Sequence, residues 1–321
     1  MRRSPWRLRR ALIATTSVVG PQDLPFLVVL RDVDCGRPPL DRALQAVGEI
    51  DPRARSFVRE VCDRVANGDC VRSALLPAVA LELHEMASDP NVHLKRVAER
   101  AVTDPSIAAR VIALGSSPLY SPHPPRTVKD ALARIGLDGV RHVVFDAAFQ
   151  SRLLRRGPLL PLVERTIRHA RTMSVIARHL AIDVGVHPGT AGLAGLLHAL
   201  GAIVLFDEFS AKRGAALPRS VAILTARVLH SWVAARVAKN HAIEPEVVQA
   251  LRDHHDHSEP TLPRLLWLCD RLSPAEPGQR AAPLEECIAR SGLPLRVEAV
   301  TDRLRPLLVT VEELVRDRIA S

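Results

Sequence analysis

The sequence has 321 residues, of which 47% are hydrophobic and 25% are charged, and its net charge is +9. This length allows one large hydrophobic core or two smaller ones. Aromatic residues make up only 3% of the chain, so Leu, Val, Ile and Ala must fill the core. That composition disfavours a β-sandwich and predicts an all-α protein.

The positive charge is spread too evenly to predict a nucleic-acid interface. One dense arginine run occupies residues 2–10, and the other arginines are scattered along the chain. A nucleic-acid footprint needs basic residues clustered on one face. We therefore expect no nucleic-acid partner, and a basic nucleic-acid-binding regulator that uses the 2–10 run is kept as an alternative.

Cysteine usage and hydropathy predict a cytoplasmic protein without a membrane span. The five cysteines form no CxxC pair, which is typical of a reducing compartment. The longest apolar run, residues 191–206, is shorter than the ~18–20 residues that cross a bilayer. No convincing cleavage site follows the N-terminal arginines, so no signal peptide is expected.

Residues 1–70 are predicted to form an N-terminal extension of small helices. Prolines and glycines interrupt the chain up to residue 39, and residues 24–33 fit a short strand or a buried turn. Helical spacing of apolar residues marks 40–47 and 53–65. No residue of this extension points to a chemistry.

Residues 71–280 are predicted to form a single helical domain. Asp104 followed by Pro105 predicts the start of a helix. Another helix is predicted to begin at Thr127 and to end at Gly136. Apolar periodicity predicts the later helices at 138–154, 160–182, 189–205, 218–239, 245–254 and 263–272. Prolines from 274 to 283 indicate a linker, and a C-terminal segment, 281–321, is expected to hold a last helix at 297–319.

Six side chains of metal-ligand type lie on separate predicted helices. They are His169, His198, His230, His254, His255 and Asp270. Imidazole suits zinc or nickel, whereas magnesium or manganese sites need hard anionic ligands. The alternative is a structural role, in which the histidines are core residues bonded to backbone carbonyls and His254 and His255 lie at a helix C-terminus.

Several short motifs follow one another over about two-thirds of the chain. They are Leu76-Pro77, the helix at 103–111, the turn at 115–120, the stretch 127–141, the block 194–201 and the double histidine 254–255. Their order resembles the HDOD (HD-related output domain) family. The family block reads Gly-Leu-Leu-His-Asp-Ile-Gly. Here Ala199 replaces its aspartate, and Ser116 stands where the turn has asparagine.

The resemblance implies an HD-like helical fold and a regulatory, non-catalytic role in bacterial signalling. HD-domain phosphohydrolases use imidazoles and carboxylates to hold metals that activate water, and Ala199 cannot ligate a metal. We therefore expect no enzyme activity, no cofactor and binding to signalling or regulatory proteins, with a divalent transition metal as the lesser possibility. The six side chains are then a vestigial or candidate metal pocket. The alternative is an HD-type phosphohydrolase acting on a nucleotide or cyclic dinucleotide, and a homo-oligomer is left open.

Overall fold

The computed structural model describes residues 39–67, 78–89, 91–117, 120–121, 123–153, 157–211, 217–241, 243–255, 260–273 and 283–304. These residues contain helices and no strand, which confirms the all-α prediction. Some sequence predictions lie outside the described residues. They are the arginine run at 2–10, the 24–33 segment, Leu76-Pro77, residues 274–282 of the linker and the last helix beyond residue 304.

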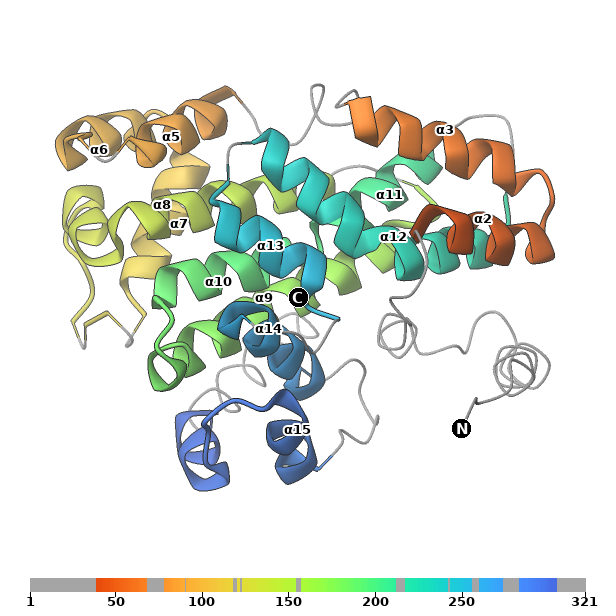
Figure 1. The fold of residues 1–321 in the computed structure, drawn as a ribbon. Helices are drawn as coiled ribbons and strands as arrows, with labels where there is room; N and C mark the ends of the chain where they lie inside the picture. Colours follow the sequence, from red (N-terminus) through yellow and green to blue (C-terminus); the bar gives the residue numbers. More distant parts are fainter. Residues whose placement is uncertain are drawn as a thin grey trace, which may run out of the picture.

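Figure 1 shows the described residues as a series of helices. In chain order they are α2 (Pro39–Ile50), α3 (Ala54–Asn67), α5 (Ala78–Ser88), α6 (Leu94–Val102), α7 (Pro105–Gly115), α8 (Val128–Leu153), α9 (Leu160–Leu180), the 3-10 turn η2 (Ile182–Val184), α10 (Pro188–Leu197), α11 (Leu200–Ala211), α12 (Arg219–Asn240), α13 (Pro245–Asp253), α14 (Thr261–Leu272) and α15 (Leu284–Ser291). Residues 297–304 are also helical.

Two hydrophobic cores organise these helices, and α8 takes part in both. The smaller core joins α5, α6, α7 and the first part of α8. The larger core contains Phe145 and Phe149 of α8 together with α9 to α14. Gly136 has a left-handed φ of 64°, a conformation that glycine adopts without a steric penalty. The helix direction therefore breaks at Gly136, where the sequence predicted an end.

Partly buried polar contacts connect the two cores. Asp146 of α8 accepts hydrogen bonds from Arg110 of α7 at 2.9 Å and from Arg171 of α9 at 2.6 Å. Arg178 of α9 donates to the hydroxyl of Tyr120, which follows α7. These contacts hold α9, which carries part of the site, against the smaller core.

The N-terminal helices share the larger core. Val47 of α2 and Val61 of α3 are fully buried in it, and both helices pack against α12. Arg64 of α3 also forms an ion pair of 2.7 Å with Glu208 of α11. The domain boundary at residue 70 stays a prediction. Residues 39–67 pack against α12, and α3 forms an ion pair with α11.

Two helical predictions need correction. The helix expected at 189–205 is interrupted at His198 and Ala199, so that α10 ends at Leu197 and α11 begins at Leu200. A helix at 284–291, α15, had not been expected because nearby prolines marked a linker. Its C-cap, Gly292, has a φ of 60°, which suits a left-handed helix end.

Two stretches are apolar and long enough to cross a membrane by length and composition alone. They are 188–211, which the break at His198 divides, and α12. Most residues of both are buried inside the fold. Their hydropathy is therefore explained by their central position in the larger core, as it is for core helices of globular proteins.

Candidate metal pocket

The fold brings all six predicted side chains into one cluster. His169 comes from α9, His198 from the break between α10 and α11, His230 from α12, the pair His254-His255 from the end of α13, and Asp270 from α14. Ring centroids of neighbouring histidines lie 4.0 to 6.0 Å apart. Five of the six residues are buried, and His255 is half-buried.

Two glycines let the α10–α11 break enter this position. A Cβ on Gly195 would lie 2.9 Å from the backbone of Met173 and Ser174 in α9. A Cβ on Gly201 would lie 1.9 Å from the carbonyl oxygen of His230 in α12. Only glycine fits such close backbone approaches, so these residues place His198 between the histidines of α9 and α12.

The first half of the cluster combines His169, His198 and Asp270. Their potential ligand atoms lie within 4.8 Å of one another. His169 Nε2 is 3.1 Å from Asp270 Oδ1, and its Nδ1 is 2.9 Å from the Ser273 hydroxyl. His198 Nδ1 donates to the Gly195 carbonyl at 2.8 Å, so its Nε2 carries the lone pair. This triad contains the single carboxylate in the two ligand groups.

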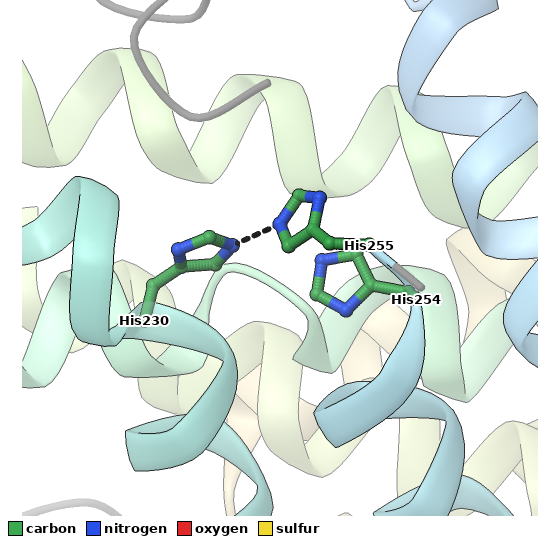
Figure 2. A group of neighbouring side chains, drawn as sticks. All are labelled: His230, His254 and His255. Carbon is green, nitrogen blue, oxygen red and sulfur yellow. Dashed lines mark hydrogen bonds between the residues drawn. The ribbon is translucent and has the colours of Figure 1, made fainter. Parts of the chain in front are cut away.

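The second half contains three histidines, His230, His254 and His255 (Figure 2). His230 Nδ1 donates to the carbonyl of Ala226 at 3.1 Å, and His254 Nδ1 donates to that of Leu251 at 2.9 Å. These bonds leave the Nε2 lone pairs of both rings free to accept. His255 Nε2 lies 2.9 Å from His230 Nε2, and a hydrogen bond between them requires the proton on His255.

Burial keeps the imidazoles of His198, His230, His254 and His255 neutral. Loss of hydration lowers the pKa of His230 to about 3 and lowers those of His198 and His255 well below the ordinary value. The pKa of His254 is lowered for the same reason. Neutral imidazole is the form that ligates metals, and a ligating histidine usually donates its other N–H to a carbonyl or carboxylate. The donor set therefore fits a transition-metal ion.

The structure also explains part of the site that the sequence did not predict. Ser273, which contacts His169, was not expected as a site group, whereas the bonds of His198, His230 and His254 to backbone carbonyls confirm the alternative interpretation of these histidines. Ser273 lies three residues after Asp270, at the end of α14, and that spacing was the available signal. Ala199 is 3% exposed and follows His198 without supplying any ligand atom.

Comparison with models of known protein families assigns the chain to a family. A family model described as the HDOD domain matches residues 74–257. The chain belongs to the HDOD family. The match includes His169, His198, His230, His254 and His255, and it ends before Asp270. The HDOD assignment supports a regulatory or signalling role for the chain.

Solved structures share the fold at low sequence identity. A "Putative metal-dependent phosphohydrolase" from Shewanella amazonensis SB2B has a TM-score of 0.64 and 20% identity, covering 80% of this chain and 98% of that chain. An HDOD domain protein of unknown function from Geobacter sulfurreducens has a TM-score of 0.58 and 22% identity, covering 83% and 98%. A "Putative signal transduction protein" from Marinobacter aquaeolei VT8 has a TM-score of 0.54 and 20% identity, covering 81% and 65%. At these identities the likeness shows the HDOD fold alone.

Curated relatives match a limited part of the chain. Ribonuclease Y proteins from Thermotoga petrophila and Thermotoga maritima are 26% identical to it over 129 residues. That match covers 40% of this chain and 22% of each ribonuclease Y. The chain thus spans about a fifth of the length of these relatives.

Proposed function

We propose that this HDOD protein is a regulatory module that acts by binding a partner protein, without turning over a substrate. The observation that carries the proposal is the composition of the pocket. Five imidazoles gather around Asp270, and position 199 holds a buried alanine. A phosphoryl-transfer site with two metals needs anionic ligands that bridge the ions and hold hard cations, and this pocket has one carboxylate.

The proposed role in signalling agrees with the fold. One structural neighbour is named as a signal transduction protein. The helices around the pocket also bury it from most sides, so a partner protein would contact the outer helix faces. We also propose that the protein lies in the bacterial cytoplasm, because its cysteine usage is typical of a reducing compartment.

A metal-dependent phosphohydrolase acting on a nucleotide or cyclic dinucleotide is the second candidate. The observation in its favour is that all six side chains of the ligand set converge although they come from distant parts of the sequence. If a metal is bound, the histidines and Asp270 hold it, and it would activate a water molecule. Ala199 removes one anionic ligand from this chemistry.

A hydrolysis assay separates the two functions. The full chain is incubated with bis-p-nitrophenyl phosphate and with cyclic dinucleotides, in the presence of Mg²⁺, Mn²⁺ or Zn²⁺ in turn. We expect the same rate for the wild type and for His198→Ala, because no turnover occurs at the pocket. Product formation that His198→Ala abolishes would refute the regulatory proposal and establish the phosphohydrolase.

A binding experiment tests the positive part of the proposal. Proteins cross-linked to the chain in its own cells are purified and titrated against the purified chain. We expect at least one to bind saturably at a fixed stoichiometry, both to the wild type and to His198→Ala. If none of the purified candidates binds saturably, the protein-partner role is wrong.

A further inference from the structure

The two halves of the histidine cluster are not equivalent, because one contains a carboxylate and the other contains only imidazoles. His169 Nε2 lies 3.1 Å from Asp270 Oδ1, at ion-pair distance but without a hydrogen bond among the described residues, and its Nδ1 is 2.9 Å from the Ser273 hydroxyl. In the other half, His254 Nε2 is buried and has no hydrogen-bond partner among the described residues.

The unpartnered atom of His254 faces a preorganised donor set. Its Nδ1–H is held by a carbonyl, as is that of His230, so both Nε2 atoms carry a lone pair, and that of His230 accepts from His255 when no ion is bound. His255 contributes the third nitrogen, its Nε2, once the proton has moved to Nδ1, and this Nε2 is 2.9 Å from His230 Nε2. Figure 2 shows the three rings together. A buried acceptor without a donor costs about 1–3 kcal/mol, and a bound cation would remove that cost.

The distances suit a single ion. Histidine nitrogens bind zinc at about 2.0–2.1 Å, so two of them at a tetrahedral angle are about 3.4 Å apart. The three candidate atoms lie within 4.8 Å of one another, with a shortest contact of 2.9 Å, and these values bracket that separation. His255 is half-buried, whereas His230 and His254 are buried.

A second ion close by is disfavoured by charge. The His198 and His254 rings, which belong to different halves, are 6.0 Å apart. Two divalent ions at about that distance repel each other by roughly 10 kcal/mol even at an effective dielectric constant near 20. Asp270 alone supplies negative charge among the two ligand groups, and Ala199 provides no carboxylate to bridge the ions.

We propose that His230, His254 and His255 bind one late first-row transition-metal ion of the zinc class, while His169 and Asp270 stay paired with each other. The site is mononuclear. Neutral imidazoles favour zinc, nickel, cobalt or copper over magnesium or manganese. The proposal deepens the proposed function by naming a ligand for the same pocket, and it rests on that function only in assuming that the ion performs no turnover.

Cobalt titration of the full chain tests the site. Protein purified without a histidine tag is stripped with a chelator and titrated with Co²⁺, and absorption and native mass spectrometry are recorded. We expect one ion per chain. Mg²⁺ in thousandfold excess should leave the absorption unchanged, and one equivalent of Zn²⁺ should displace Co²⁺. Failure to bind an ion, or binding of two, would overturn the proposal.

Matched variants locate the ion. His255→Ala should weaken Co²⁺ binding at least 100-fold, whereas His169→Ala, in the same cluster, should change it less than tenfold. Circular dichroism verifies the fold, and His255→Gln replaces His255→Ala if the latter unfolds. Loss of binding in His169→Ala, or retention in a folded His255 variant, contradicts the assignment. Neither result bears on hydrolysis, so this test and the assay of the proposed function fail independently.

Discussion

At the scale of single residues, Ala199 leaves the pocket without a carboxylate at the position after His198. It follows His198 at the break between α10 and α11, where its side chain is buried next to the cluster. A carboxylate at this point would add a second negative charge to a pocket that has only Asp270. Hard divalent cations prefer oxygen ligands, and more ligand charge raises their affinity.

Restoring the carboxylate should therefore change the number of ions bound. For Ala199→Asp we expect Mn²⁺ affinity to increase at least tenfold and the Co²⁺ stoichiometry to rise from one to two per chain. Equilibrium dialysis with metal analysis measures both quantities. Ala199→Asn, which has the same size without the charge, is the control and should behave like the wild type. An unchanged stoichiometry in a folded Ala199→Asp protein would show that charge does not limit the site.

At the scale of elements, the sequence identified the candidate ligand residues better than it predicted their arrangement in space. Metal-type side chains on separate helices were enough to predict the cluster. The break at His198 was not predictable, because residues 191–206 form one apolar run and periodicity alone reads such a run as a continuous helix. The contact between His169 and Ser273 forms only through tertiary packing, whereas the carbonyls that orient the other rings lie three or four residues before each histidine.

The contact between Gly201 and α12 gives a prediction at this scale. In Gly201→Ala the new methyl group would lie 1.9 Å from the His230 carbonyl oxygen, so α12 must move. Overpacking of a core typically costs about 1–3 kcal/mol, and we expect urea unfolding to show a loss at the upper end of that range. Cobalt binding should weaken in parallel, because His230 moves with α12.

Gly157→Ala is the matched control for that substitution. A Cβ on Gly157 would lie 3.6 Å from Ser210, an ordinary van der Waals contact. We expect its unfolding free energy to stay within about 0.5 kcal/mol of the wild type, as is usual for surface substitutions. Equal destabilisation by the two alanines would show that close backbone packing at Gly201 does not position the site.

At the scale of the whole molecule, several histidines lose hydration on folding. Desolvation lowers the pKa of His142 on α8, as it does that of His230, to about 3. It also lowers the pKa values of His198, His254 and His255. In the unfolded chain these side chains take up protons near pH 6.5. The folded protein therefore binds fewer protons than the unfolded chain whenever the pH falls below that value.

The free energy of unfolding should consequently fall on acidification. A depressed folded-state pKa leaves stability intact above about pH 6.5 and removes it progressively between pH 6.5 and 3. Each such histidine contributes up to about 1.4 kcal/mol per pH unit. With several of them, we expect a loss of at least about 3 kcal/mol per unit between pH 6 and 5, measured by urea unfolding in the presence of a chelator.

The histidine origin of this slope can be verified by substitution. His230→Gln replaces one titrating ring by an amide that does not titrate, so the slope between pH 6 and 5 should decrease by about 1.4 kcal/mol per unit. Stoichiometric Zn²⁺ should steepen the acid transition of the wild type, because protons compete with the ion for the same nitrogens. A wild-type stability that stays constant from pH 7.5 to 5 would mean that the imidazoles gain protons without unfolding the core, and the neutral character of the cluster would be wrong.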